Sequence, residues 1–228
     1  MAVADQTARA SADVARAGLR VTEIFHSLQG ETSRVGLPTV FVRLTGCPLR
    51  CGYCDTAYAF HGGTTRTLDQ VLAEVARHGT HYVTVTGGEP LAQTNCLPLL
   101  AALADRGYSV SLETSGALDV SHVDRRVSRI VDIKTPGSGE AEKNRWENLA
   151  YLNERDEIKF VLCGEADYEW AKAVLAERRL ERVCPVLFSP SYAELPPAAL
   201  AEWILRDRLP VRMQLQLHKV LWGETPGR

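Results

Sequence analysis

The sequence predicts an α/β fold in which parallel strands form an incomplete barrel of the TIM type. Short β-rich segments alternate with amphipathic stretches, and turn residues such as Gly, Pro and Ser separate them. This alternation is typical of a parallel sheet with right-handed crossovers. About seven strands and fewer long helices are too few for a closed eight-stranded barrel, so a partial barrel is expected.

Seven segments have the composition of strands, because β-branched and aromatic residues dominate them and turn residues flank them. In chain order they are TVFVRL (39–44), HYVTVT (81–86), YSVSLE (108–113), RIVDIK (129–134), IKFVLC (158–163), CPVLFS (184–189) and RMQLQL (212–217). Residues 21–223, which hold all seven, are expected to form one core domain.

Four stretches between these strands have the periodicity of amphipathic helices. The clearest is TLDQVLAEVARHG (67–79), whose apolar residues share one face behind Thr67, a predicted N-cap. The other three are NCLPLLAALADRG, EADYEWAKAVLAERR and PPAALAEWILRDR, the last opening with prolines that suit a first helical turn.

The bulk composition excludes several classes of function. With 45% apolar residues the chain can bury one good-sized core, and a net charge of −2 predicts no basic face for nucleic acid. No apolar run is long enough to cross a bilayer, and charges interrupt the alanine-rich residues 1–20, which are expected to be a flexible or helical extension. Residues 224–228 are expected to form a short tail. Six cysteines without an export signal indicate the cytoplasm, where clustered thiols favour metals over disulfides.

Unusual residues follow the predicted strand ends. A cysteine-rich loop follows the first predicted strand, and GGEP, TSG, TPGSG and SPS follow four of the later ones. Because the carboxyl ends of parallel strands meet at one edge of the sheet, these segments are expected to form one site.

The loop TGCPLRCGYCDT places Cys47, Cys51 and Cys54 in the pattern C-x3-C-x2-C. A structural zinc ion normally needs a fourth ligand, which the nearby His61 could supply, so zinc stays an alternative. A four-iron cluster on three thiolates would instead leave one iron open for an external ligand. The remaining cysteines, Cys96, Cys163 and Cys184, lie in helical or apolar strand patterns and are expected to be buried structural thiols.

This loop, with Tyr53 before its last cysteine, resembles that of the radical S-adenosylmethionine enzymes, and TGGEP (86–90) strengthens the resemblance. The segments VTEIFHSLQGET, GLPTVFVRLTGCPLRCGYCDTAYAF, LETSG and QLQLHKVLW further resemble the 7-carboxy-7-deazaguanine synthases, from about Val21 to Trp222. The resemblance implies a radical SAM core that binds a [4Fe-4S] cluster, S-adenosylmethionine and Mg²⁺.

The same resemblance implies an activity. Family members convert 6-carboxy-5,6,7,8-tetrahydropterin to 7-carboxy-7-deazaguanine with loss of ammonia, a ring contraction in queuosine and 7-deazapurine biosynthesis. It also implies a homodimer and a flavodoxin-like or other one-electron reductant as partners, with no nucleic acid and no membrane.

The resemblance assigns roles residue by residue, and it assigns no side chain a catalytic role, because the cofactor carries the chemistry. The cluster ligands would be Cys47, Cys51 and Cys54. The cofactor contacts would be Tyr53, Gly88, Glu89, Ser115, Asp132, Lys134, Phe188, Ser189, Pro190 and Ser191. The substrate contacts would be Leu28, Gln29, Gly30, Glu31, Arg43, Thr86 and His218. Thr56 would bind Mg²⁺, with Asp55 steadying its waters.

Physical chemistry supports the roles of Glu31, Arg43 and Thr56, and an ordinary alternative stays open for Arg43, Thr56 and His218. A Glu31 carboxylate complements a planar edge of N–H donors, and an Arg43 guanidinium suits a substrate carboxylate, although strand arginines more often form salt bridges. A Thr56 hydroxyl suits a hard cation, although Thr after Asp is more often a turn or cap residue. His218 could equally be a core histidine that caps a strand.

Two other functions fit part of the sequence. A glycyl-radical-enzyme activase shares the cysteine loop and GGEP, but such proteins often carry a second cysteine cluster, which this chain does not have. A zinc-binding, non-catalytic adaptor would explain the cysteine loop alone.

Overall fold

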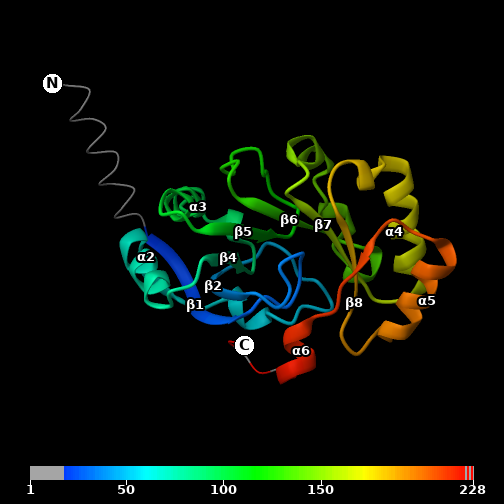
Figure 1. Cartoon of the computed structure of the whole chain (residues 1–228), viewed down its shortest axis with the longest axis horizontal. Helices are drawn as coiled ribbons and strands as arrows, with labels where there is room; N and C mark the ends of the chain where they lie inside the picture. The colour runs from blue at the N-terminus through cyan, green and yellow to red at the C-terminus, as the bar shows by residue number, and fades with distance from the viewer. Residues whose placement is uncertain (1–17, 224, 226, 228) are drawn as a thin grey trace.

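The computed structural model, which describes residues 18–223, 225 and 227, contains one nine-stranded sheet. The strand order is β3-β1-β2-β4-β5-β6-β7-β8-β9, and all pairs from β2 to β9 are parallel. The sheet curves, with β3 and β9 as its open edges, and the helices α2 to α5 lie outside the curve (Figure 1). The predicted partial barrel is confirmed.

The strands are β1 (Gly18–Leu28), β2 (Pro38–Leu44), β3 (Thr64–Thr67), β4 (Tyr82–Gly87), β5 (Ser109–Thr114), β6 (Ser128–Ile133), β7 (Glu157–Leu162), β8 (Val186–Pro190) and β9 (Arg212–Met213). The α-helices are α2 (Leu68–Arg77), α3 (Cys96–Asp105), α4 (Glu165–Arg178), α5 (Pro197–Asp207) and α6 (Leu217–Trp222). Short 3₁₀ turns are η1 (Ala57–Phe60), η2 (Pro90–Ala92), η3 (Pro136–Ser138), η4 (Ala141–Lys143), η5 (Trp146–Tyr151) and η6 (Leu180–Arg182).

Two strands were missed by the sequence analysis. β1 pairs antiparallel with both β2 and β3, and its residues beyond Val21 are mostly half-buried rather than alternating between buried and exposed. The strand begins at Gly18, three residues before the boundary predicted for the core, and the rest of the predicted extension lies outside the described residues. The cysteine loop therefore follows β2, the second strand in the chain.

The last predicted strand, 212–217, is mostly wrong. Only Arg212 and Met213 pair with β8, and the chain then turns back across the open side of the sheet. The Leu217 amide donates to the Gly30 carbonyl at 2.9 Å, and α6 begins there. His218 consequently lies on a helix and does not cap a strand.

The four predicted helices are present, and α2 shows the expected cap. The Thr67 side chain accepts from the Gln70 amide, and the Gln70 side chain accepts from the Thr67 amide, so both exposed N–H groups are satisfied. None of the helices among the described residues is long and apolar enough to cross a membrane.

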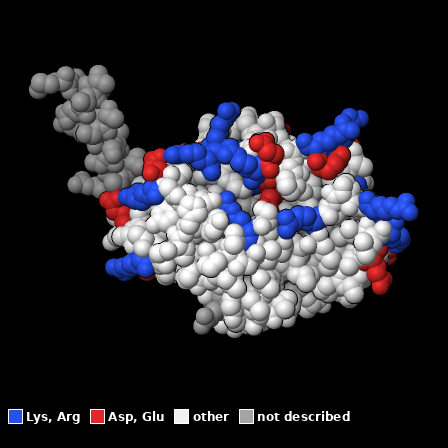
Figure 2. All heavy atoms as spheres, in the orientation of Figure 1, with Lys and Arg blue, Asp and Glu red and all other residues white. Residues whose placement is uncertain are grey.

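The helices and the sheet enclose two neighbouring apolar clusters. The first joins β1, β2, β4 and β5 to α2 and α3, and the second joins β6, β7 and β8 to α4 and α5. On the face drawn in Figure 2, basic and acidic side chains mix along the upper part of the view, so that face carries charges of both signs.

Replacing Phe160 tests the second cluster. Its ring is fully buried and lies 5.4 Å from the Phe188 ring and 6.3 Å from the Trp170 ring, between centroids. Phe160→Ala should lower the free energy of unfolding by about 3–5 kcal/mol, because it leaves a cavity that its neighbours cannot fill. Leu205→Ala on α5, where the side chain is 76% exposed, should change it by less than about 0.5 kcal/mol. Urea unfolding followed by circular dichroism measures both, and equal losses would contradict this packing.

Candidate active site

One cavity of about 750 Å³ opens at the carboxyl ends of the parallel strands. Its wall includes residues from β1, β2, the cysteine loop, β4, β5, β6, β7 and α6. The wall also includes residues of three predicted loop segments: Gly87 and Gly88 of GGEP, Thr114 and Ser115 of TSG, and Ser191 after β8. Four of the five predicted segments therefore contribute to one cavity, whereas TPGSG (135–139) does not line it and contacts the cysteine loop instead.

The cysteine loop lies against the loop that follows β6. The thiols of Cys47, Cys51 and Cys54 all line the cavity. The Gly52 amide donates to the Ser138 carbonyl at 3.0 Å, and the Arg50 amide donates to the Glu140 carboxylate. The Arg50 guanidinium also lies 4.3 Å from the centre of the Phe60 ring. Contacts on both sides thus hold the loop in position.

The cysteine loop offers three thiols but no complete site for a single metal ion. Within residues 18–223, 225 and 227, no three His, Cys, Asp or Glu side chains converge on a point where one ion could bind. His61, the predicted fourth zinc ligand, is exposed. Three thiolates can each bind a different iron of a cluster, so the thiols that line the cavity are the candidate ligands of an iron–sulfur cluster.

GGEP is more than a turn, because Glu89 is fully buried behind the cavity wall. The Glu89 amide donates to the Gly46 carbonyl at 2.8 Å, which joins this segment to the cysteine loop. Its carboxylate accepts from the Leu91 amide at 2.9 Å and from the Ser115 amide at 2.7 Å. A Cβ atom on Gly88 would collide with Gly46 and Cys47, so only glycine permits this approach.

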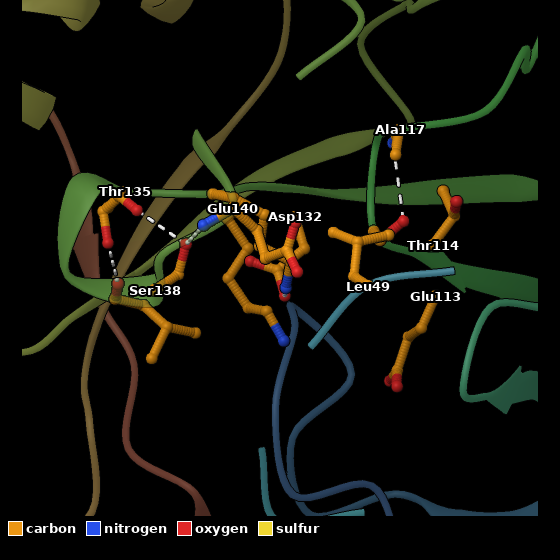
Figure 3. Close-up of polar contacts among 12 residues, drawn as sticks. Leu49, Glu113, Thr114, Ala117, Asp132, Thr135, Ser138 and Glu140 are labelled. Carbon is orange, nitrogen blue, oxygen red and sulfur yellow. Dashed lines mark hydrogen bonds and ion pairs between the residues drawn. The ribbon is translucent and has the colours of Figure 1, made fainter. Parts of the chain in front are cut away.

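Two buried polar atoms near the thiols have no hydrogen-bond partner among the described residues. They are the Tyr53 hydroxyl and one carboxylate oxygen of Asp132. The other Asp132 oxygen pairs with the Lys134 ammonium at 2.6 Å. In Figure 3, Asp132 lies between the loop that carries Ser138 and the end of β5. Buried polar atoms are nearly always paired, so these two indicate that a polar ligand binds here.

Not every predicted cofactor contact reaches the cavity. Ser115, Lys134 and Ser191 line it, but Phe188, Ser189 and Pro190 are buried within β8. The Phe188 ring packs in the second apolar cluster, against Phe160 and Tyr168. The structure does not place the Phe188 side chain on the cavity wall.

All seven predicted substrate contacts line the cavity. Arg43 lies between the rings of Phe25 and Tyr58, with its guanidinium carbon 5.7 and 5.8 Å from their centroids. Its Nε donates to Glu23 at 2.7 Å, which is the strand salt bridge considered above. Because the Glu23 contact uses Nε, the two terminal nitrogens keep the fork that a carboxylate needs.

Two charged residues of the wall were missed by the sequence analysis. Lys159 on β7 pairs with the Glu31 carboxylate at 2.6 Å, and Glu113 on β5 accepts from the Thr86 hydroxyl at 3.0 Å. The sequence does contain a signal that could have identified them: each is the one charged residue in an otherwise uncharged predicted strand, Lys159 in IKFVLC and Glu113 in YSVSLE. Burial acts to raise the pKa of Glu31, but the Lys159 charge and the hydrogen bonds from Lys159 and Gln216 together outweigh it, so this pKa lies below its usual value. Burial raises the pKa of Glu113, although Lys159 opposes the shift.

Thr56 does not act as a helix cap. It occupies the N-cap position of η1, but its hydroxyl makes no capping bond and donates to Asp55 at 2.7 Å. Lys219 of α6 approaches the other Asp55 oxygen at 3.3 Å. Burial lowers the pKa of the nearby His218, which keeps its imidazole neutral at physiological pH. Thr56 and Asp55 thus present oxygen atoms to the cavity, as a hard cation requires.

Comparison with known proteins extends over nearly the whole chain. The sequence profile of the Radical SAM superfamily matches residues 41–135. A 7-carboxy-7-deazaguanine synthase of Chlorobaculum tepidum is 51% identical, over 91% of this chain and 96% of that protein. Another, of Koribacter versatilis, is 44% identical, over 92% of this chain and 100% of that protein. The chain belongs to the 7-carboxy-7-deazaguanine synthase family.

Solved structures agree with this membership. The crystal structure of QueE from Escherichia coli superposes with a TM-score of 0.72 at 25% identity, over 88% of this chain and 95% of that one. SuiB of Streptococcus suis bound to S-adenosylmethionine superposes with a TM-score of 0.52 at 13% identity, over 75% of this chain and 48% of that one. The second likeness shows the fold alone. Within the synthase family, the partial barrel described here is thus shared at low sequence identity.

Replacing Glu89 tests how the site is held together. In Glu89→Gln one oxygen becomes an NH₂ group, which must face either the Leu91 or the Ser115 amide, both of which are donors. We expect a loss of about 1–3 kcal/mol in the free energy of unfolding of the apoprotein. Glu147→Gln, at an exposed position in η5, is the matched control and should be neutral. Equal urea midpoints for the two variants would show that the Glu89 contacts do not stabilise this edge.

Proposed function

We propose that this chain is a radical SAM carbon–nitrogen lyase that converts 6-carboxy-5,6,7,8-tetrahydropterin to 7-carboxy-7-deazaguanine with loss of ammonia. The relatives named above carry that activity in their names. The observation that supports it best is one cavity lined both by three thiols and by two charged groups, Glu31, which pairs with Lys159, and Arg43, which pairs with Glu23. This combination suits a radical-generating cofactor beside a pterin that bears a carboxylate.

Three cysteines would hold the cluster. Cys47, Cys51 and Cys54 would each bind one iron of a [4Fe-4S] cluster and leave the fourth iron to S-adenosylmethionine. When bound, this pair supplies a 5′-deoxyadenosyl radical, which abstracts hydrogen from the substrate. Gly88 lines the cavity, and its lack of a side chain lets the cysteine loop approach closely, so its backbone would lie beside the methionine moiety.

The rest of the cofactor would lie along the ends of β5, β6 and β8. The unpaired oxygens of Tyr53 and Asp132 offer it hydrogen-bonding partners, and Ser115, Lys134 and Ser191 line the same wall. Residues Phe188, Ser189 and Pro190, buried in β8, would contribute through the backbone. Glu89 would act by fixing the Gly88 backbone, because its carboxylate is already bonded on both oxygens.

Substrate orientation would rest on opposite charges at the two ends of the pterin. The Arg43 guanidinium would bind the substrate carboxylate, and the ionised Glu31 would accept N–H groups of the guanidine-like edge. Leu28, Gln29 and Gly30 would frame that edge, with Thr86 and His218 on either side. Fixing both ends places one carbon of the ring toward the thiols, and the geometry decides which hydrogen is lost.

Magnesium would bind at Thr56, and Asp55 would hold its waters. A homodimer is supported by apolar side chains exposed on α6, where Val220 is 67% and Leu221 49% exposed. The lower part of the face in Figure 2, where α6 lies in Figure 1, is largely uncharged. A flavodoxin-like or other one-electron reductant would supply the electron that the cluster needs.

The direct test combines reconstitution with one cysteine exchange. The reduced wild-type protein, given S-adenosylmethionine, Mg²⁺ and carboxytetrahydropterin, should yield 7-carboxy-7-deazaguanine, identified by mass. Cys51→Ala should lose cluster absorbance and all product, because no described cysteine lies where it could replace the thiolate. Cys163→Ala, the control, should keep both, since this half-buried thiol lies off the cavity wall. A colourless wild-type protein that contains zinc would favour the adaptor and refute the proposal.

Thr56 has its own test. Thr56→Ala should keep folding and cluster content but lose most product and respond weakly to added Mg²⁺, whereas Thr56→Ser should recover part of the activity. Losing a mere turn residue would cost about 1 kcal/mol of stability and leave the chemistry unchanged. Product formation against Mg²⁺ concentration distinguishes these outcomes, and superimposable curves for the three proteins would remove Thr56 as a ligand.

A further inference from the structure

Lys159 is a buried cation that the reaction proposed above does not use. Its side chain is 10% exposed, and its ammonium lies 2.6 Å from Glu31 Oε2. Glu113, a second buried carboxylate on the same cavity wall, is also close enough to raise the pKa of Lys159. Lys159 therefore interacts electrostatically with two carboxylates, one in the segment after β1 and one on β5.

The contacts of Glu31 fix its carboxylate in one plane. Lys159 donates to Oε2, and the Gln216 side chain donates to Oε1 at 3.0 Å. The Glu31 amide donates to the Gln29 side-chain oxygen at 3.1 Å, and the Gln29 amide group donates to Glu113 at 3.3 Å. Each Glu31 oxygen keeps a lone pair for a ligand, and the donors Lys159 and Gln216 fix the direction in which the carboxylate points.

The charge balance around Glu31 depends on Lys159. Burial alone would raise the pKa of this carboxyl, and Lys159 is the largest of the influences that lower it. His218, neutral because burial lowers its own pKa, adds little. The other charged groups on the cavity wall are Arg43, Asp55, Glu113, Asp132, Lys134, Glu194 and Lys219, and the remaining titratable groups are the three thiols and the hydroxyls of Tyr53, Tyr58 and Tyr192. Lys134 and Lys219 are already engaged with Asp132 and Asp55, so Lys159 is the cation in contact with Glu31.

We propose that Lys159 is a positioning residue that keeps the Glu31 carboxylate ionised and aimed, and thereby sets which edge of a heterocycle the cavity accepts. This inference rests on the proposed function, in which Glu31 meets the guanidine-like edge of the substrate. An ionised carboxylate offers acceptors only, so it selects an edge with two adjacent N–H donors. A protonated Glu31 would offer one donor, which would face an N–H group of the pterin without a partner.

The test follows the pH dependence of KM. Lys159→Met keeps the length of the side chain and removes its charge, so burial raises the Glu31 pKa. Below that raised pKa, Glu31 is protonated and the KM for carboxytetrahydropterin should rise about tenfold per pH unit. Wild type, with the pKa of Glu31 below its usual value, should keep a flat KM between about pH 6 and 8.5. Lys159→Arg should restore most of the flat profile.

Two controls separate this role from a structural one. Lys172→Met removes a lysine on α4 that pairs with Glu169 and Asp207 outside the cavity, and it should leave the KM profile unchanged. In Glu31→Gln, adding Lys159→Met should change KM less than about threefold, because the Glu31 carboxylate that Lys159 would hold is already absent. This double variant buries no unpaired charge from the ion pair, so it stays informative even if Lys159→Met alone does not fold.

Separate outcomes identify which idea fails. A flat KM profile for Lys159→Met, or a pH dependence that persists in the Glu31→Gln background, would overturn the role of Lys159. The rate of S-adenosylmethionine cleavage without substrate should be equal in wild type and Lys172→Met, since Lys172 lies outside the cavity. If wild type cleaves S-adenosylmethionine but never turns over carboxytetrahydropterin, the proposed function fails, and with it the assignment of Lys159.

Discussion

Glu89 holds together three loops that the sheet only brings near one another. Its amide donates to the cysteine loop, and its carboxylate accepts from its own turn and from the end of β5. Parallel strands place their carboxyl ends at one edge, but loops at such an edge have no common hydrogen-bond ladder. The buried Glu89 carboxylate accepts hydrogen bonds on both oxygens, and these bonds fix the positions of the loops relative to one another. The position of the thiols relative to the rest of the cavity depends on this carboxylate.

The sequence predicted the parallel strands and the thiol wall well, because their signals are local. Apolar runs such as HYVTVT and the spacing of Cys47, Cys51 and Cys54 need no knowledge of distant residues. β1 was missed because it lies antiparallel at one side of the sheet, where much of it is only half-buried. Lys159 and Glu113 were missed for a related reason. Their strands are apolar, and only the curvature of the sheet reveals that these two side chains meet Glu31 inside the cavity.

The buried charges of the cavity wall add little to the free energy of unfolding. A buried ion pair such as Lys159 with Glu31 contributes little net stability, because removing both charges from water offsets their attraction. Well-packed apolar side chains at the same positions are often as stabilising or more so. The two large apolar clusters between the sheet and its helices stabilise the fold instead, since they contain most of the buried aromatic and aliphatic residues. The fold thus separates the two apolar clusters from the wall that carries the buried charges.

The spacing of the Glu31 contacts determines the order in which the protein assembles. Glu31 is 128 residues from Lys159 and 185 residues from Gln216 along the chain. Contacts of such long range form late, because large loops must close first. The three thiols, by contrast, lie within a single loop between β2 and η1. A folding chain can therefore gather the three thiols in one loop before the segment after β1 reaches β7 and the residues that precede α6, which are the contacts that complete the surroundings of Glu31.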